Sequence, residues 1–196
     1  MDLQGFGATK EYVRLTNRHF EQVHRFYIAL DLETTGLSHD SDRIVEIGAV
    51  AFRNGQPAER FNTFVNPGRP IPIGASMVNH ITDDMVADAP DEREALLELF
   101  AFLNRFSGYD LLFVGHNAAF DFSFLCAACN RQGFSVNFRY LDTLRIARST
   151  LRTVPNYKQD TLAAHYGLMN PMAHRAESDA LTCGRILLAL LAEIES

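Results

Sequence analysis

The chain has 196 residues, of which 47% are hydrophobic and 11% aromatic, and its formal net charge is -6. This size and apolar content suit one packed domain and exclude wholesale disorder. No apolar run approaches the roughly 20 residues of a membrane helix, and the polar amino terminus lacks a signal-peptide pattern, so we expect a cytoplasmic protein. The acidic balance argues against a general nucleic-acid coat protein, but not against an enzyme that grips only a strand end.

The first half of the chain predicts one helix and then a meander of strands. Residues 9–24 show an amphipathic helical pattern with Thr9 as a cap, and we treat residues 1–24 as a helical extension of a single domain over 25–196. An apolar strand starts near Tyr27. Two further strands, over 43–52 and 60–65, flank an Asn54-Gly55 pair that is typical of an antiparallel hairpin turn.

The remaining chain predicts alternating strands and helices. Prolines end the strand pattern and a loop is expected over 71–80, followed by a short turn capped by Thr82. Short strands are expected over 111–114 and 140–142, and helices over 92–106 (capped by Asp91), 118–131 (closed by Gly133), 143–152, 159–166 and 176–194. Together these elements predict an α/β fold with one central mixed five-stranded sheet flanked by helices.

Two acids mark the end of the first strand. Asp31 and Glu33 are two residues apart, so in an extended strand both carboxylates point to the same face. Like charges this close stay ionised only beside a cation, and a hard divalent metal prefers such oxygen ligands. The simpler interpretation, a pair of solvated surface acids, is weakened by the apolar run that leads into Asp31.

The three cysteines do not indicate a metal or redox site. Cys126 and Cys129 form a C-x-x-C pair, but only Cys183 remains, and a zinc site needs four ligands. Packing of one helix face at i and i+3 explains the pair, and the odd number of cysteines fits a reducing compartment.

Further polar residues at strand ends and helix starts could complete a site with Asp31 and Glu33. Asp121 lies one turn into the helix that follows the apolar strand 111–114. His174 and Asp179 are five residues apart and could not share a helix face. We therefore expect His174 in a loop, from which it could swing over Asp179 in the second turn of the last helix. Taken singly, both could be ordinary surface residues.

Taken together, these residues resemble the motifs of the DEDDh family of 3'-to-5' exonucleases, and in particular its proofreading members. The three motifs stand in the family's order and spacing between about residues 27 and 183. They read Asp31-Leu32-Glu33-Thr34-Thr35-Gly36 (with Glu46-Ile47-Gly48-Ala49 behind it), His116-Asn117-Ala118-Ala119-Phe120-Asp121, and His174-Arg175-Ala176-Glu177-Ser178-Asp179-Ala180.

The resemblance implies a ribonuclease H-like fold that holds two divalent cations, Mg²⁺ or Mn²⁺. It implies that Asp31 bridges both ions, that Glu33 and Asp179 complete one, and that Asp121 holds the second. His174 would be the general base, because an imidazole can accept a proton from water near neutral pH. Two ions about 3.5 to 4 Å apart would polarise the scissile phosphate, activate the attacking water and stabilise the leaving 3'-oxygen.

The same resemblance suggests which residues hold the substrate. The loop near Val78 and His80, with Phe120, would flank the terminal base through apolar and aromatic contacts that tolerate any base. The segment from Arg139 to Lys158 contains five basic residues and one acidic residue. Arg145, Arg148 and Arg152 fall on one helical face that could contact phosphates, although a solvated face is the simpler interpretation. The full set of expected substrate contacts is Thr34, Thr35, Gly36, Val78, His80, Asn117, Phe120 and Arg148.

The motifs therefore predict a metal-dependent exonuclease that removes nucleoside monophosphates from 3' ends. We expect single-stranded DNA rather than RNA as the substrate, and a role in proofreading or repair. Three alternatives stay open: an RNA-trimming enzyme, a non-catalytic nucleic-acid-binding module, and a phosphodiesterase of small molecules. Proofreading subunits typically carry a further carboxy-terminal segment that holds the polymerase. This sequence ends at Ser196, soon after the third-motif helix, so no tail supports a polymerase partner. The apolar stretch from Ile186 to Ile194 fits burial in the core or a subunit interface.

Overall fold

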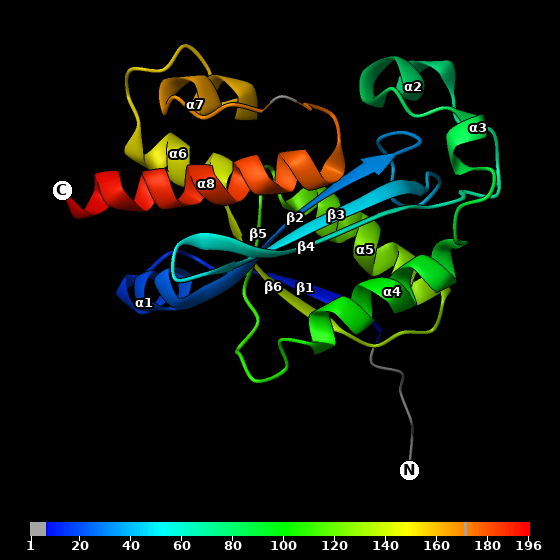
Figure 1. Ribbon diagram of the computed structural model, residues 1–196, viewed down its shortest axis with the longest axis horizontal. Helices are drawn as coiled ribbons and strands as arrows, with labels where there is room; N and C mark the ends of the chain where they lie inside the picture. Colours follow the sequence, from blue (N-terminus) through cyan, green and yellow to red (C-terminus); the bar gives the residue numbers. More distant parts are fainter. Residues whose placement is uncertain (1–6, 171) are drawn as a thin grey trace.

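The computed structural model describes residues 7–170 and 172–196, which form one six-stranded sheet with helices on both faces (Figure 1). The strands are β1 (Thr9–Tyr12), β2 (Phe26–Thr34), β3 (Ile44–Arg53), β4 (Gln56–Phe64), β5 (Phe113–Gly115) and β6 (Asn137–Asp142). The helices are α1 (Asn17–Arg25), α2 (Ile73–Asn79), α3 (Asp83–Val86), α4 (Glu92–Asn104), α5 (Ala119–Arg131), α6 (Thr143–Thr150), α7 (Gln159–His165) and α8 (Ala176–Glu195).

The sheet is mixed, and its strand order is β1-β6-β5-β2-β3-β4. The pairs β1–β6, β6–β5 and β5–β2 are parallel, whereas β2–β3 and β3–β4 are antiparallel. The Asn54-Gly55 turn predicted from the sequence joins β3 to β4, and both residues have positive φ, as the tight hairpin turn requires. The parallel strands β2, β5 and β6 end at the same edge of the sheet, where their loops can meet.

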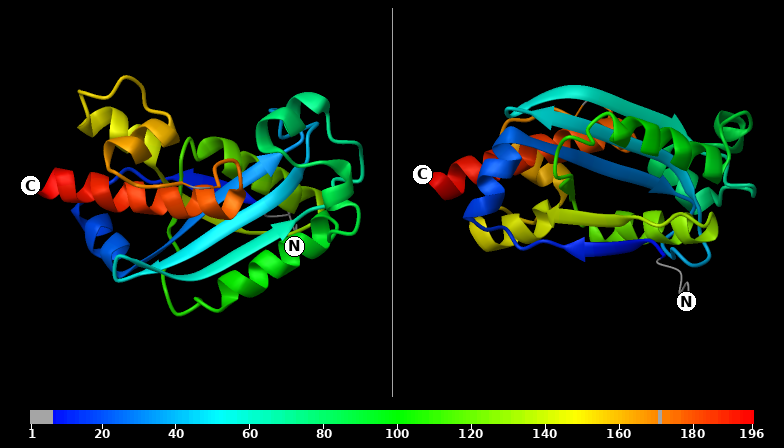
Figure 2. Two further views of the ribbon diagram at one scale, coloured as in Figure 1. Left: turned by 45° about the horizontal axis from the view of Figure 1, so that its top comes forward. Right: turned by 90° about the horizontal axis from the view of Figure 1, so that it is seen from below.

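Two apolar layers hold the helices to the sheet (Figure 2). One layer packs α4 and α5 against one face and is rich in phenylalanine, for example Phe113, Phe122 and Phe138. The other packs α1, α6, α7 and α8 against the opposite face. The central strands β2 and β3 are buried almost from end to end because helices cover both of their faces. The predicted α/β class is confirmed.

Three details differ from the sequence-based expectations. Residues 9–12 are not the start of a helix: they form β1, an edge strand that pairs with β6, so the sheet has six strands rather than five. The expected loop over 71–80 contains α2. Helix α6 ends at Thr150, so Arg152 does not continue the helical face of Arg145 and Arg148.

Other expectations are confirmed. Asp91 caps α4 and accepts a hydrogen bond from the backbone N–H of Glu94 at 2.9 Å. The C-x-x-C pair lies on α5 and all three cysteines are unpaired. The apolar face of α8 is buried against the sheet, although its last turn is exposed and Ile194 retains 43% of its surface. None of the helices in the described residues has the length and apolar content to cross a bilayer.

Candidate active site

A cleft of about 310 Å³ opens beside the central strand β2 and brings the three sequence motifs together. Asp31 and Glu33 come from β2, Asp121 from the first turn of α5, and His174 from the loop that precedes α8. Asp179 also lines it, but it lies in the first turn of α8, one turn earlier than expected. The complete lining is Asp31, Leu32, Glu33, His116, Asn117, Phe120, Asp121, Lys158, Gln159, Asp160, Ala173, His174 and Asp179.

The close approach of α8 to the sheet places Asp179. Buried Glu46 on β3 accepts hydrogen bonds from the guanidinium of Arg175 at 2.8 Å and from the backbone N–H of Ala176 at 3.2 Å. A Cβ atom on Gly48 would collide with the peptide between Ala176 and Glu177. The Glu-Ile-Gly stretch of β3 therefore anchors the first turn of α8 beside β2.

Asp179 is held by donors on both of its carboxylate oxygens. Its Oδ1 accepts hydrogen bonds from the side-chain amides of Asn170 at 2.6 Å and Gln159 at 3.2 Å. Its Oδ2 accepts one from the backbone N–H of His174 at 2.9 Å. Ser178 in turn bonds Asn170, so the carboxylate is fixed by a small polar network.

The loop of the second motif is fixed from β6. Buried Asp142 accepts hydrogen bonds from the backbone N–H groups of Asn117 at 3.1 Å and Leu144 at 3.0 Å, so one carboxylate both shapes the motif and caps α6. The Nδ1 atom of His116 lies 2.9 Å from the Thr143 hydroxyl. Asp121 accepts a hydrogen bond from the backbone N–H of Leu32 at 3.2 Å, which ties α5 to β2.

Backbone strain concentrates at the cleft. Within the described ranges 7–170 and 172–196, four residues other than glycine have positive φ, and of these only Asn54 belongs to a hairpin turn. The other three are His80, Asn117 and His174, with φ of 58°, 59° and 63°. L-residues rarely adopt this conformation, and surrounding contacts must hold them there, as is common at functional sites. The rings of His80 and His174 meet edge to face with centroids 6.3 Å apart.

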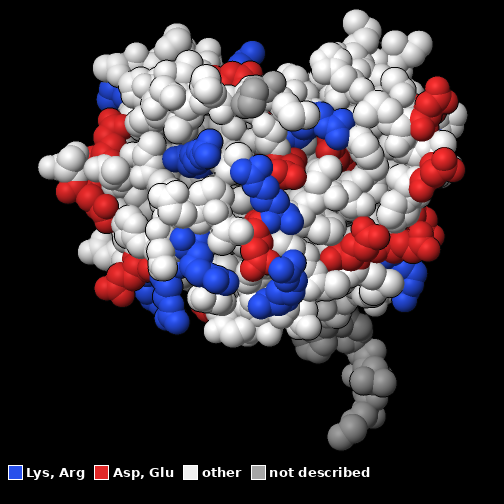
Figure 3. Space-filling model, in the orientation of Figure 1, with Lys and Arg blue, Asp and Glu red and all other residues white. Residues whose placement is uncertain are grey.

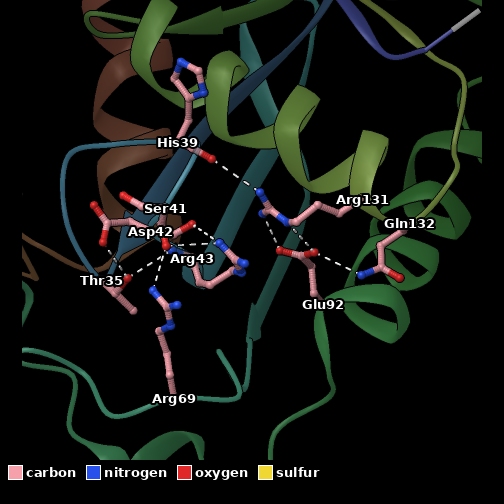
Figure 4. A network of polar contacts seen from close by, with 9 residues as sticks. All are labelled: Thr35, His39, Ser41, Asp42, Arg43, Arg69, Glu92, Arg131 and Gln132. Carbon is pink, nitrogen blue, oxygen red and sulfur yellow. Dashed lines mark hydrogen bonds and ion pairs between the residues drawn. The ribbon is translucent and has the colours of Figure 1, made fainter.

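The loop between β2 and β3 is tied down by the polar network in Figure 4. The Thr35 hydroxyl accepts a hydrogen bond from the backbone N–H of Arg43 and lies 3.5 Å from the Asp42 carboxylate. The guanidinium groups of Arg43 and Arg69 both donate to the Ser41 carbonyl. Thr34 and Thr35 are buried and use their hydroxyls within this loop, so their expected contact with substrate stays a prediction.

The acids of the cleft are mutually repulsive. Burial, and then the charges of Asp121, Asp179 and Glu33, raise the pKa of Asp31. Burial followed by the charge of Asp179 raises the pKa of Glu33 to about 8, and burial, with a contribution from the charge of Glu33, raises that of Asp121 to about 8. Burial also raises the pKa of Asp179. Such a cluster carries its full negative charge only when a cation balances it.

The donor atoms fit a hard divalent cation. One carboxylate oxygen each of Glu33 and Asp179 and one ring nitrogen of His174 all lie within 4.8 Å of one another. Asp31 and Asp121 add two further carboxylates to the same cleft. Carboxylates that face a shared space are the ligands that Mg²⁺ and Mn²⁺ prefer.

Several residues of this site were missed by the sequence reasoning. Asp142 could have been found, because it ends a short strand predicted to lie beside the others. Gln159 and Asn170 carried no signal, because each reaches Asp179 only through tertiary packing. Lys158 and Asp160 also line the cleft. Val78 and His80 are exposed on and after α2, whereas Arg148 is exposed on α6.

The sheet is mixed, its central strand ends in two acids, and two helices add further carboxylates to them. This arrangement defines a ribonuclease H-like nuclease fold. The profile of the exonuclease family matches residues 28–187. The chain therefore belongs to this exonuclease family, as the motifs predicted.

Relatives agree with this membership, and solved structures agree with the fold. The chain is 37% identical over 174 residues to DNA polymerase III subunit epsilon of Treponema pallidum, covering 86% of this chain and 78% of that protein. It is 36% identical over 169 residues to DNA polymerase III PolC-type of Caldanaerobacter subterraneus, of which it spans only 12%. The fold is similar to E. coli Exonuclease I in complex with a dT13 oligonucleotide (TM-score 0.70, 19% identity, 86% of this chain, 41% of that chain). It is also similar to Exonuclease X in complex with 5' overhanging duplex DNA (TM-score 0.65, 24% identity, 87% of this chain and 93% of that chain).

Proposed function

We propose that this protein is a metal-dependent exonuclease that releases nucleoside monophosphates from the 3' end of single-stranded DNA. The observation that carries the proposal is the convergence of Asp31, Glu33, Asp121, His174 and Asp179, which are up to 148 residues apart in sequence, on one cleft. The similarity to an epsilon subunit and to exonucleases in complex with DNA supports DNA as the substrate.

The carboxylates would hold two divalent cations, Mg²⁺ or Mn²⁺. Asp31, at the centre of the cluster, would be shared by both ions, Glu33 and Asp179 would hold one, and Asp121 the other. Bound cations of this kind polarise a phosphodiester, make water a better nucleophile and stabilise the departing oxygen. The amides of Asn170 and Gln159 keep Asp179 oriented, and Glu46 keeps α8 in place.

A ring nitrogen of His174 would accept the proton of the attacking water. The imidazole is exposed at the mouth of the cleft and close to Glu33 and Asp179. Imidazole is the side chain best suited to proton transfer near neutral pH. Its left-handed backbone and the bond from its N–H to Asp179 limit where the ring can go.

The terminal nucleotide would lie against Asn117 and Phe120, with Val78 and His80 on the opposite lip. Val78 leaves 59% of its surface exposed, which suits an apolar contact with a base. Lys158 in the cleft and Arg148 on α6 offer positive charge to the backbone. The acids of α3 and the start of α4 account for part of the negative net charge, and they lie at the right of Figure 3, outside the lining of the active-site cleft.

The decisive test compares Asp31→Ala with wild type on a 3'-labelled single strand with Mg²⁺ or Mn²⁺. We expect near-total loss of cleavage with the fold intact by circular dichroism. Activity close to wild type would refute the assignment. Binding of the strand by wild type without cleavage would instead favour a non-catalytic module.

Matched DNA and RNA oligomers test the substrate class, because the motifs do not distinguish ribose from deoxyribose. A preference for RNA would replace the DNA proposal by the RNA-trimming alternative. Cleavage of a small phosphodiester, with intact oligomers, would favour the phosphodiesterase alternative. Association with a polymerase is a proposal that rests on the names of the relatives alone.

A further inference from the structure

A second cleft, of about 570 Å³, lies at the end of the molecule where α1, α6 and the end of α8 gather (Figure 2). Its lining is Tyr12, Arg14, Leu15, Thr16, Asn17, Phe20, Arg145, Ile146, Ser149, Thr150 and Ile194. The family profile covers residues 28–187 only, so the segment 12–20 and Ile194 lie outside it. This cleft is therefore built largely by parts of the chain that the family match does not include.

The charge of this cleft is opposite to that of the active site. None of its described lining residues is acidic, whereas five acids line the active-site cleft. Within residues 7–170 and 172–196, Arg14 makes no hydrogen bond or ion pair. Arg145 lies over the Tyr12 ring at 4.4 Å and only 3.9 Å from the Asp142 carboxylate. In a chain with a net charge of -6, a cleft whose charged groups are both positive favours an anionic ligand.

The remaining lining suits a ligand that also has flat apolar parts. Phe20 is half-buried and Ile194 leaves 43% of its surface exposed. Ser149 and Thr150 add hydroxyl groups along the rim. A positive groove with an aromatic side chain and hydrogen-bonding groups is the combination that binds single-stranded nucleic acid without sequence preference.

Helix α6 connects this cleft to the active site. At its start, Asp142 holds the backbone of Asn117 and Thr143 contacts His116, and both partners line the active site. Further along α6, Arg145 and Arg148 are exposed, and Arg145 lines the second cleft. The exposed side of α6 thus carries two positive groups, Arg145 and Arg148, on the helix that touches both clefts.

The separation of the clefts can be expressed in nucleotides. Asp179 lines the active site and Ile194 lines the second cleft, and both belong to α8. At a rise of about 1.5 Å per residue, their positions on the helix differ by about 22 Å. A stacked strand advances about 3.4 Å per nucleotide, so the gap corresponds to about six nucleotides.

We propose that the cleft of Arg14, Phe20 and Arg145 binds the substrate strand about six nucleotides upstream of its 3' end. This inference rests on the proposed function, because it continues the same strand. Arg14 and Arg145 contact backbone phosphates, and a base lies on Phe20. The cleft thereby gives long strands an affinity that short ones lack.

The first experiment measures binding in EDTA, where no cleavage occurs, by anisotropy of labelled oligothymidylates of about 4 and about 12 nucleotides. Arg14→Gln is the main variant because Arg14 makes no hydrogen bond or ion pair with the part of the chain that the structure describes, and Arg145→Gln is the second. Arg93→Gln is the control, because Arg93 lies on α4 on the opposite face of the sheet and the charge change is the same. We expect both variants to bind the long strand about 3- to 10-fold more weakly, with a salt slope lower by about 1, and the short strand as wild type does.

The second experiment places a reporter in the cleft. The chain has no tryptophan, so Phe20→Trp creates a single tryptophan there, whose emission can be excited selectively. Its emission should change with the long strand and not with the short one, whereas Leu97→Trp, exposed on α4, should respond to neither. Melting temperatures of all variants confirm that each is folded.

The outcomes separate this inference from the proposed function. If both Arg14→Gln and Arg145→Gln bind the long strand as tightly as wild type does, the second site is overturned. If wild type still cleaves both strands with metal, the proposed function stands. Absence of long-strand binding by wild type in EDTA overturns the second site, whereas absence of cleavage of both strands with Mn²⁺ overturns both proposals. A Phe20→Trp signal that responds equally to short and long strands would show that the cleft does not lie upstream on the strand and would also overturn the inference.

Discussion

Gly48 on β3 lies directly against the backbone of Ala176 at the start of α8, at a separation that leaves no room for a Cβ atom on Gly48. Gly48 is also the residue that pairs with Asp31 across the β2–β3 ladder. The absence of a side chain therefore lets α8 approach the sheet at the level of Asp31, and Asp179 follows within the first turn. The glycine is required here for its size, since its φ is not in the left-handed region.

Gly48→Ala should displace the start of α8 and separate Asp179 from Asp31. The added methyl group meets backbone atoms that cannot rotate away, so we expect destabilisation by about 1–3 kcal/mol, and a loss of cleavage that persists at temperatures where the variant is fully folded. Gly74→Ala is the control, because Gly74 lies on α2 with open space around its Cα. It should keep activity and gain up to about 1 kcal/mol from better helix propensity. Full activity of Gly48→Ala would contradict the packing argument.

The parts of the fold that carry the site were predictable from the sequence because they have strong local patterns. The apolar run that ends in Asp31 and Glu33, the Asn54-Gly55 turn and the Asp91 cap each encode their element within a few residues. Strand β1 does not: three of its four residues are exposed, and its partner β6 lies 128 residues away along the chain. An amphipathic helical pattern therefore outweighed it, although the sheet edge needed a strand.

The active-site residues likewise divide into those with a local sequence pattern and those placed only by tertiary packing. Carboxylates that follow strands or open helices could be recognised from spacing, whereas the residues that orient them could not. Gln159 and Asn170 come from segments that approach Asp179 only when α7 and the loop after it pack against α8. Leu32 likewise contributes a backbone N–H, which no side-chain pattern can indicate.

The stability of the metal-free protein should fall as pH rises from about 4 to about 8. Glu33 and Asp121 have ordinary pKa values of 4.5 and 3.8, and in the folded protein both are raised to about 8. Between these limits the folded state binds more protons than the unfolded state, so raising the pH favours unfolding. Thermal unfolding in EDTA across this range measures the effect.

Adding Mn²⁺ should reverse this trend, because the cation competes with the protons. The metal-induced rise in melting temperature should be small near pH 5 and increase toward pH 8. Asp31→Asn removes the central charge. In this variant we expect both the melting temperature in EDTA and the metal-induced rise to depend less on pH. A melting temperature in EDTA that climbs between pH 5 and 8 would contradict the raised pKa values.

Asp31→Asn should also separate stability from activity. Burial and four neighbouring acids raise the pKa of the Asp31 carboxyl, so its charged form is unfavourable without metal. The neutral amide removes that repulsion, and at pH 8 in EDTA we expect the variant to melt at a higher temperature than wild type while it loses cleavage. Glu98→Gln on α4, outside the cleft, should change neither. A less stable Asp31→Asn variant would show that the acidic cluster is not strained.

The amides on Asp179 should govern metal affinity. Asn170→Ala and Gln159→Ala each remove one donor from Oδ1 and leave the carboxylate itself in place. Loss of such an orienting partner typically weakens metal binding about 10- to 100-fold, so cleavage should need more Mn²⁺ and recover at saturation. Titration of Mn²⁺ followed by melting temperature gives a readout without turnover. Asn104→Ala, at the exposed end of α4, is the control, and unchanged affinity in the two variants would remove the clamp from the mechanism.

The ring of His174 lies close to Glu33 and Asp179, so it could act either as a proton acceptor or as a metal ligand, and one variant distinguishes the two roles. If His174 is the proton acceptor, the His174→Ala substitution should lower kcat by about 10²- to 10⁴-fold and leave the Mn²⁺-induced rise in melting temperature intact. Added imidazole should then restore part of the cleavage activity. As a ligand, the same variant would lose most of that thermal shift, because a ligand contributes directly to the affinity. We expect the first pattern, because the carboxylates of Asp31, Glu33, Asp121 and Asp179 remain to hold the cations. His24→Ala, on the surface beside Glu195, controls for loss of an imidazole elsewhere, and a thermal shift abolished in His174→Ala alone would reassign the residue to the metal.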